Sequence, residues 1–284
     1  MPVSKTEEKE LPSTLSPPPS VSALDDDLCQ WLKSDSSTQQ TFVMIQRGTT
    51  VYWGLFLANG PLTPVFQFIH GVFEVNRDHS FFILRQRLWV CGVVTEFCEQ
   101  VVKVCAKRIS KSELSDMLER VRVGLETSQF IRISPPSFPK NAWPLLSEVY
   151  LPAYDDEKLS RGRFVEKLAA QVERTSVLHD SNWPIGAAVF FKNKILSVGR
   201  NQSFAVKTQH AEVQMVLRWY LQTGQLLPRG CEVWVTHKPC RMCAGLLRYW
   251  SEDGADVNVC FLQDVTGGLS NHQILTGMKH IQSQ

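Results

Sequence analysis

Apolar residues between positions 41 and 94 occur in short runs separated by turn-forming residues such as Asn59, Gly60 and Pro61. The runs, which are rich in β-branched and aromatic residues, read TFVMIQ, TVYWGLFLA, PVFQFIH, SFFILRQ and RLWVCGVV. Short apolar runs bounded by turn residues are typical of strands and hairpins. This part of the chain therefore predicts a mainly antiparallel sheet.

Helical spacing follows the predicted strands and leads to a proline-rich segment. Helices are predicted at about 95–108 and 110–126, the second opening with Ser110 and Glu113 at capping-box spacing. Four prolines between 135 and 144 predict an extended linker. The predicted organisation is a disordered tail over 1–25, an independently folded α+β domain over 26–134, a linker over 135–145 and a second domain over 146–284.

The second domain alternates helices with strands. The expected elements are a helix at 158–178, strands at 184–191 and 195–199, a helix at 210–222, a strand at 232–236, a helix at 240–250 and a strand at 257–262. This order is typical of an α/β layered sandwich with helices covering a mixed sheet. The sequence shows no internal repeat, and the front half does not copy this order.

Composition restricts the class of protein more than its partners. With 43% hydrophobic residues and a net charge of +2, the chain is neither collagen-like nor wholly disordered, and global charge gives no indication about nucleic acid. No apolar stretch approaches the ~18 residues of a membrane span, and the first twenty-five residues lack the apolar core of a secretory signal. We therefore expect a soluble cytoplasmic protein without a membrane partner, or a nuclear one if the source is eukaryotic. In a reducing compartment, grouped cysteines more often serve metal binding or catalysis.

Two short motifs supply such a group. They are His210-x-Glu212 and Pro239-Cys240-x-x-Cys243, each at the start of a predicted helix. A CxxC pair at a helix start places both thiolates on one turn, where the helix dipole favours their deprotonated form. One imidazole nitrogen and two sulfurs suit Zn²⁺, and a set of three protein ligands leaves a position for water, as in catalytic zinc sites.

Other interpretations of these residues remain open from the sequence alone. His237 could complete a four-ligand structural zinc site, and the two cysteines could form a metal-free core pair. Glu212 could be a solvated acid of the first helical turn. Alternatively it could point beyond the helix end and carry a proton beside the metal.

The motifs resemble those of the zinc-dependent nucleoside and nucleic-acid deaminases. The resemblance covers about residues 158–282 and is strongest to the TadA-type tRNA adenosine deaminases, through the segments PIGAAVFF, GRNQ, PCRMCAG, FLQDVTGG and TGMKHI. It implies a cytidine-deaminase-like three-layer α/β/α sandwich with a mixed sheet. It also implies a zinc ion on His210, Cys240 and Cys243, with Glu212 as general base and then general acid.

The resemblance further implies how a substrate is held. Asn201 would contact the base or ribose, and Ala211 and Pro239 would form pocket walls. Independently of the resemblance, five basic residues lie on or near the motif segments, where a phosphate backbone would pass, namely Arg200, Lys207, Lys238, Arg241 and Arg248. The predicted phosphate-binding residues among them are Arg200, Lys207 and Arg241. Each position also has an ordinary interpretation, as a turn-capping Asn, a helix-start Ala, a strand-end Pro or a solvated surface charge.

The predicted activity is hydrolytic deamination of adenine to give inosine in tRNA or other RNA, with RNA a more probable partner than DNA. Two departures from the TadA group weaken the link to tRNA: Lys238 replaces a usually acidic residue, and the sequence stops at Gln284 before the group's C-terminal helix. The alternatives are deamination of a free nucleoside or base, or of cytosine in nucleic acid, and a catalytically silent nucleic-acid-binding or partner subunit. The N-terminal domain is expected to recruit substrate or to cover the surface that TadA-type enzymes use for dimerisation, so either a homodimer or intramolecular packing is expected.

Overall fold

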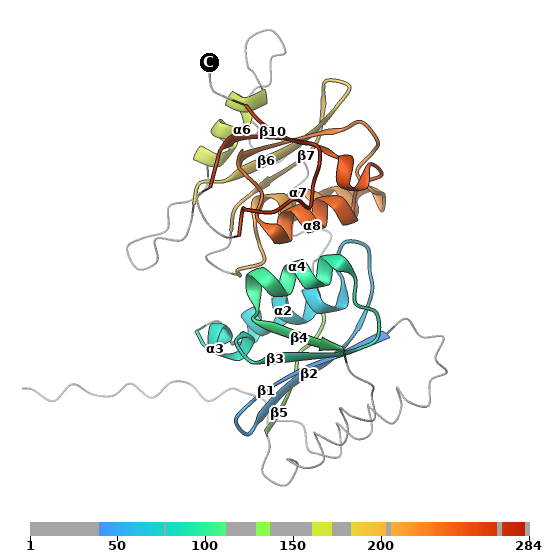
Figure 1. Ribbon diagram of the computed structural model, residues 1–284, viewed down its shortest axis with the longest axis vertical. Helices are drawn as coiled ribbons and strands as arrows, with labels where there is room; N and C mark the ends of the chain where they lie inside the picture. Colours follow the sequence, from blue (N-terminus) through green and yellow to red (C-terminus); the bar gives the residue numbers. More distant parts are fainter. Residues whose placement is uncertain are drawn as a thin grey trace, which may run out of the picture.

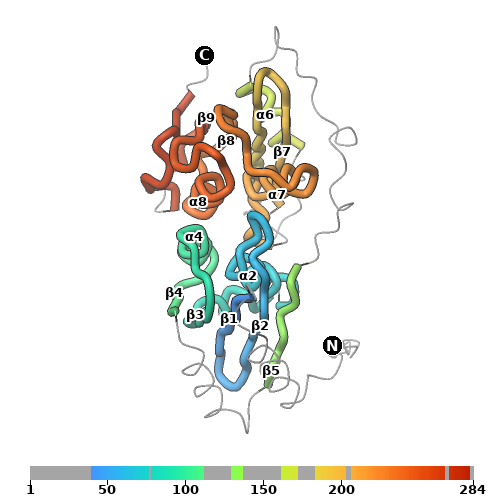
Figure 2. Tube along the Cα trace, turned by 90° about the vertical axis from the view of Figure 1, so that its right-hand side faces the viewer, coloured from blue at the N-terminus to red at the C-terminus, as the bar shows by residue number. Residues whose placement is uncertain are grey.

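The computed structural model describes residues 40–76, 78–111, 129–136, 161–171, 183–202, 206–265 and 269–281. They form an α/β protein with two five-stranded mixed sheets, each with helices on the face turned toward the other sheet (Figures 1 and 2). We call residues 40–136 the first lobe and residues 161–281 the second lobe. Within the described part of the chain, no helix is both long and apolar enough to span a membrane.

The sheet of the first lobe has the strand order β4-β3-β1-β2-β5. Its strands are β1 (Gln40–Arg47), β2 (Thr50–Leu57), β3 (Arg87–Cys91), β4 (Arg108–Lys111) and β5 (Gln129–Arg132). β1 is antiparallel to β2 and β3, whereas β3–β4 and β2–β5 are parallel pairs. The strands within 41–94 therefore pair antiparallel, as predicted for that range. The whole sheet is mixed, because helix α4 (Glu96–Cys105) connects β3 to β4 and returns the chain in the same direction, and β5 adds a second parallel pair.

Two of the five predicted strands are helices. PVFQFIH lies in α2 (Pro64–Val75) and SFFILRQ contains α3 (Ser80–Leu84). The Thr63 hydroxyl accepts a hydrogen bond from the N–H of Phe66 and caps α2, and Pro64 suits the first helical position. Residues 64–73 are all buried, so this part of α2 has no solvent-exposed face, and the short apolar run PVFQFIH is hard to distinguish from a buried strand by periodicity.

The remaining helix predictions of the first lobe have different outcomes. The helix predicted at 95–108 is confirmed as α4. Ser110, the predicted start of the next helix, belongs to strand β4 instead, because residues 108–111 pair with β3. Most of the helix predicted to 126, and the linker beyond residue 136, lie outside the described residues.

The second lobe follows the predicted order of elements. They are α6 (Arg161–Ala170), β6 (Gly186–Phe191), β7 (Lys194–Arg200), α7 (Ala211–Thr223), β8 (Glu232–His237), α8 (Arg241–Tyr249), a 3₁₀ turn (Gly254–Asp256), β9 (Asn258–Gln263) and β10 (Met278–His280). The sheet order is β10-β9-β8-β6-β7. α6 packs on one face through Phe164 and Leu168, while α7 and α8 cover the other face, which gives three layers.

The two lobes repeat one topology. In the first lobe, the hairpin β1–β2, helix α2, strand β3, helix α4 and strand β4 give the order β4-β3-β1-β2. In the second lobe, the hairpin β6–β7, helix α7, strand β8, helix α8 and strand β9 give the order β9-β8-β6-β7, with the same parallel and antiparallel pairs. The expectation that the front half does not copy the second was therefore wrong. The repeat escapes sequence inspection because α2 and α3 read as strands.

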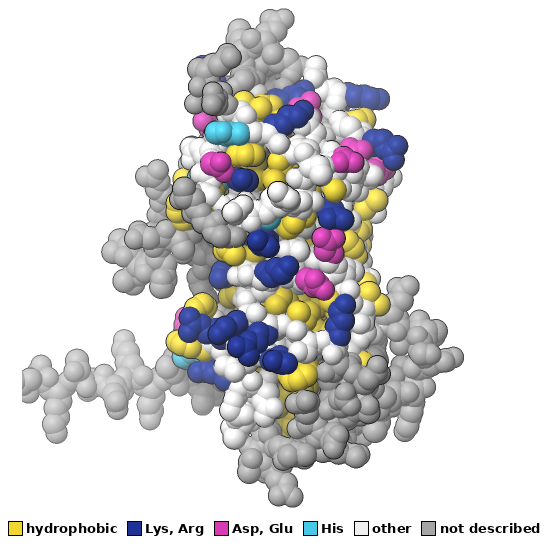
Figure 3. Space-filling view, in the orientation of Figure 1, with side chains coloured by type: hydrophobic (Ala, Val, Ile, Leu, Met, Phe, Trp, Pro, Cys, Tyr) yellow, Lys and Arg dark blue, Asp and Glu magenta, His cyan; other side chains and the backbone are white. Residues whose placement is uncertain are grey.

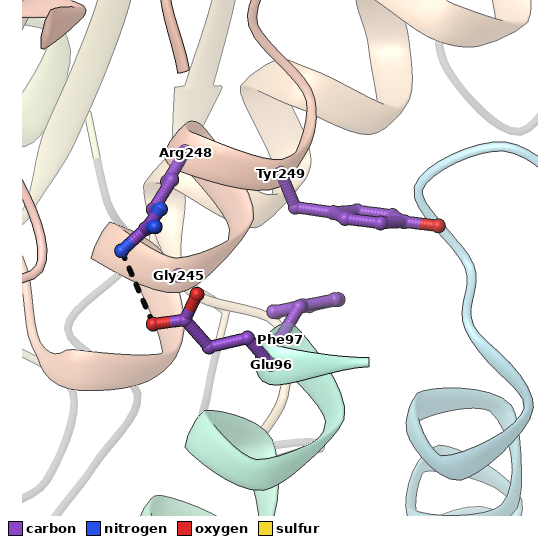
Figure 4. Close-up of a pocket in the computed structure, with 5 residues that line it drawn as sticks. All are labelled: Glu96, Phe97, Gly245, Arg248 and Tyr249. Atoms are coloured by element: carbon purple, nitrogen blue, oxygen red, sulfur yellow. Dashed lines mark hydrogen bonds and ion pairs between the residues drawn. The ribbon is translucent and has the colours of Figure 1, made fainter. Parts of the chain in front are cut away.

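The lobes pack through their helices. α4 lies along α8 (Figure 2). A single cluster of buried apolar side chains extends through both lobes. Gly245 lets the backbone of α8 approach α4, since a Cβ there would lie 3.0 Å from the Gln100 side chain. Figure 4 shows one end of this interface, where Glu96 and Arg248 form a 3.2 Å ion pair beside the stacked rings of Phe97 and Tyr249, around a small pocket.

Candidate metal centre and active site

The metal-ligand candidates lie at the starts of two neighbouring helices. His210 is the residue before α7, and Cys240 is the residue before α8. Both have extended backbone and are partly exposed, and Cys243 is buried in the first turn of α8. α7 and α8 both begin at the same end of the sheet, so the His210 imidazole and the sulfurs of Cys240 and Cys243 come close together.

The distances between these donors fit a tetrahedral zinc ion. Nδ1 of His210 lies 3.6 Å from Sγ of Cys240 and 3.5 Å from Sγ of Cys243, and the three ligand atoms all lie within 4.8 Å of one another. Tetrahedral bonds of about 2.05 Å to nitrogen and about 2.3 Å to sulfur would separate the two atoms by about 3.6 Å. The donor set therefore fits zinc, and it identifies Nδ1 as the ligating nitrogen of His210.

The electrostatics of the group favour binding of a cation. A hydrogen bond from the Cys243 thiol, together with the adjacent His210, holds the pKa of Cys240 well below its usual range. Burial raises the pKa of Cys243. Burial is the largest influence on His210 and acts to lower its pKa, but the negative charge and hydrogen bond of Cys240 together with the charge of Glu212 outweigh it, and the pKa is raised. The site thus stabilises positive charge next to the Cys240 thiolate. A metal dication that displaces the protons of these ligands would be stabilised in the same way.

Glu212 is buried beside this group. It is the second residue of α7 and only 4% of its surface is exposed. Burial and then the negative charge of Cys240 raise the pKa of its carboxyl group. The interpretation of Glu212 as a solvated first-turn acid is therefore wrong. A buried carboxyl with a raised pKa beside a metal-binding group suits proton transfer.

His237 does not join the ligand group. Its Nδ1 lies 3.1 Å from the Thr236 hydroxyl, and its ring meets Trp183 edge-on at 5.7 Å. Burial lowers the pKa of His237. The described residues therefore place three ligand candidates in the group, which is the number found in catalytic zinc sites.

The predicted substrate-contacting residues are engaged within the protein. The buried Asn201 side chain donates to the carbonyl of Trp183 over 3.1 Å, and the Pro239 carbonyl faces Nε2 of His272 at 2.9 Å. Ala211 is fully buried between β7 and the core. The role of the three residues as pocket walls or in substrate binding remains a prediction.

The predicted phosphate-binding residues differ in position. Lys207 lies close enough to His210 for its positive charge to act on the pKa of the imidazole. Arg200 donates to the Gln171 side chain over 3.3 Å, and Arg241 donates to the Asn271 carbonyl over 3.0 Å. The structure therefore brings Lys207 to the metal centre and holds the other two in contacts with neighbouring segments.

Sequence reasoning missed a contact from the first lobe. Nδ1 of the buried His70 in α2 lies 2.7 Å from the hydroxyl of Thr208, which is also buried and precedes His210 by two residues. Nε2 of the same ring lies 3.3 Å from Glu74. No spacing in the sequence relates residue 70 to residue 208, so only the fold reveals that α2 supports the segment carrying the first ligand.

The repeated topology shows what occupies the corresponding positions of the first lobe. Thr63 precedes α2 as His210 precedes α7, and Val65 stands where the second lobe has Glu212. Thr95 precedes α4, with Cys98 three residues later, as Cys240 and Cys243 are placed at α8. The Thr95 hydroxyl lies 3.2 Å from the Cys98 sulfur. The first lobe therefore has the same residue type at one of the three ligand positions, Cys98, and lacks the carboxylate.

Comparison with known proteins relates the second lobe to deaminases. Residues 176–281 match the family model of the Bd3614-like deaminases. A structure from studies of A-to-I editing by tRNA:A34 deaminases is 24% identical over 29% of this chain and 62% of its own, with a TM-score of 0.25. A guanine deaminase from Bacillus subtilis is 26% identical over 28% and 50%, with a TM-score of 0.25, and a dCMP deaminase from the cyanophage S-TIM5 is 19% identical over 41% and 94%, with a TM-score of 0.30.

The chain thus spans less than two thirds of the length of the first two of these proteins. The family match and the His/Cys/Cys group agree on the same region of the chain. The carboxyl-terminal region is deaminase-like and carries a group of residues consistent with a zinc site.

Proposed function

We propose that this protein is a zinc-dependent hydrolytic deaminase of nucleobases, related to the TadA-type tRNA adenosine deaminases, that converts adenosine to inosine in RNA. One observation carries the proposal. Three donors spaced for a tetrahedral ion lie beside the buried carboxyl group of Glu212, within the segment that matches a deaminase family. His210, Cys240 and Cys243 would hold the ion.

The chemistry that zinc supplies in such a site is activation of water as a nucleophile near neutral pH. Glu212 accepts the proton that the attacking water loses. It delivers this proton to the ring nitrogen next to the reacting carbon. It then takes the remaining proton of the added hydroxyl group and passes it to the amine, which leaves as ammonia while the carbonyl forms. The net reaction consumes one water and replaces a C–NH₂ group by a carbonyl. A carboxyl group with a raised pKa suits both directions of transfer.

The choice of adenine in RNA rests on the resemblance of GRNQ and PCRMCAG to the tRNA adenosine deaminases. A base must leave its stack to reach a recessed centre, and unpaired RNA loops present such bases at the least cost. Lys207 beside the centre would face the adjoining phosphate.

A free nucleoside or base is the second candidate substrate. Arg200 and Arg241, two of the three predicted phosphate-binding residues, are hydrogen-bonded within the protein. This leaves fewer free cations beside the centre for a polynucleotide backbone.

A product assay distinguishes the candidates. Purified zinc-loaded protein is incubated with adenosine, cytidine, guanine, single-stranded DNA and loop-containing RNA, and the products are identified by mass spectrometry. We expect inosine in RNA and none with the Glu212→Gln variant. Turnover of free nucleosides or bases alone would favour the second candidate, and a zinc-loaded protein without turnover on any substrate would contradict the proposal.

A further inference from the structure

The first lobe has a cluster of exposed positive charges at one end, which we call the basic end. Its members are exposed Lys and Arg residues at the end of α3, the end of α4 and the strands that follow, namely Arg85, Arg87, Lys103, Lys107, Arg108 and Lys111. Figure 3 shows Lys and Arg side chains gathered over this region. Within the part of the chain that the structure describes, none of the six forms an ion pair with an acidic residue.

Backbone pairing holds these charges close together. Arg87 and Arg108 are aligned in the parallel pair β3–β4, and the Arg87 side chain donates to the Ser110 hydroxyl over 3.2 Å. The N–H of Lys107 donates to the carbonyl of Leu84 over 3.1 Å, which places it beside Arg85. Adjacent like charges repel one another, so an uncompensated cluster of this kind favours binding of a polyanion.

Aromatic rings are interleaved with the cations. The guanidinium of Arg85 lies 4.1 Å from the centre of the Phe81 ring, and Phe81 is 52% exposed. Phe82 is 49% exposed, and Arg87 lies over Trp89. Exposed aromatic rings and guanidinium planes can stack on the flat faces of unpaired bases. The carboxylates of an acidic protein surface offer no flat ring for such stacking. The combination favours single-stranded nucleic acid over other polyanions.

The basic end is on the same side of the molecule as the metal centre. α4 runs antiparallel to α8, because Glu96 at its start pairs with Arg248 at the end of α8, and Cys105 at its end contacts Met242 at 3.8 Å. Met242 lies between the two candidate cysteine ligands. Lys107 and Arg108 follow the end of α4 directly, so the cluster begins where α4 meets the metal centre.

We propose that the basic end of the first lobe binds the sugar-phosphate backbone of single-stranded polynucleotide and thereby holds a substrate whose base reaches the metal centre. The second half of this statement rests on the proposed function, and the first half does not. The first lobe, which repeats the fold without the full set of metal ligands, would then serve as the binding half of the molecule.

Binding is tested in the full-length, zinc-loaded Glu212→Gln protein with a fluorescein-labelled single-stranded RNA of mixed sequence, by fluorescence anisotropy at several salt concentrations. The triple variant Arg85→Ala/Lys107→Ala/Arg108→Ala is compared with a matched control of three exposed lysines elsewhere, Lys167→Ala/Lys194→Ala/Lys279→Ala. Loss of three phosphate contacts should weaken binding at least about tenfold and reduce the slope of log K against log salt by about 2. The control should bind as the parent does, and melting curves verify that all proteins are folded.

The proposal is overturned if the folded triple variant binds RNA as the parent does, or if the control loses as much affinity. It is also overturned if the parent binds polyglutamate or phosphatidylserine vesicles but neither RNA nor single-stranded DNA. The binding assay involves no turnover, whereas the product assay for the proposed function uses the parent enzyme. Either result can therefore be negative without affecting the other.

Discussion

At the residue scale, each of the three candidate ligands contributes one corner of the metal site. Nδ1 of His210 is about equally distant from both sulfurs. Because a site with three protein ligands has no spare donor, Cys240→Ser should leave the protein with far less than one zinc per chain after dialysis. Inductively coupled plasma mass spectrometry measures this, with the partly buried Cys91→Ser as control. A Cys240→Ser protein that keeps its full zinc content would contradict the assignment.

Glu212 links catalysis to pH at the same scale. Glu212→Gln should keep zinc and lower kcat by about 10²–10⁴, the usual contribution of general acid–base catalysis. The folded-state pKa of Glu212 is raised, so in the metal-free protein its ionisation opposes folding as pH rises from the unfolded pKa through the folded one.

Thermal melting of the metal-free proteins tests that sign. Parent and Glu212→Gln should differ least in acid, and the variant should become relatively more stable as pH rises. A relative stability that is constant with pH would show that the carboxyl group is not buried as described.

His70 is a positioning residue reached only through the fold. His70→Phe keeps a ring stacked near Phe66 but leaves the buried Thr208 hydroxyl without this partner, which costs about 1–3 kcal/mol of stability. We expect a lower melting temperature and a lower kcat, with KM less affected, because the segment before His210 loses its support. His70→Gln, which retains a hydrogen-bonding group, should recover part of kcat. Equal kcat and zinc content in His70→Phe and the parent would rule this role out.

At the scale of elements, β7 and α7 approach so closely that only glycine fits between them. A Cβ at Gly199 would lie 1.9 Å from the carbonyl oxygen of Ala211, the residue after His210. Gly199→Ala should displace the start of α7 and so reduce the zinc content. It should also lower the free energy of unfolding, measured by urea denaturation, by at least the ~1–3 kcal/mol typical of overpacking. Gly162→Ala in α6 is the control, since its nearest neighbour is a flexible Leu262 side chain and alanine favours helix. Equal losses in both variants would contradict this explanation.

How far the elements could be predicted depends on their exposure. α7 and α8 were predicted because turn residues and motifs marked their starts, and β6 and β7 because Lys192 and Asn193 mark a tight turn, where both adopt positive φ. α2 was missed because it is buried on all sides. The metal-ligand set could be inferred from the spacing of His210, Cys240 and Cys243, since helix starts bring such residues together. The His70–Thr208 contact and the charges of the basic end depend on tertiary packing, which no local pattern encodes.

At the scale of the whole molecule, the sequence predicts two independently folding units, whereas the apolar cluster crosses from one lobe to the other. Separating α4 from α8 would expose the apolar side chains that they share, including Phe97 and Leu246. We therefore expect a single cooperative unfolding transition of the full chain in differential scanning calorimetry. The fragment 146–284 should aggregate or self-associate in size-exclusion chromatography. Two separate transitions, or a monomeric fragment with its full zinc content, would contradict this expectation.

The repeated topology also affects how the protein can change over time. In an isologous dimer, every substitution appears twice, so a surface cannot gain charge on one half without gaining it on the other. Here the two copies of the fold are joined in one chain and differ in sequence, so each can change alone. The covalent link also keeps their contact independent of protein concentration. Dilution should therefore leave the specific activity of this protein unchanged. A substitution that improves one lobe is not duplicated in the other lobe, where it could be harmful.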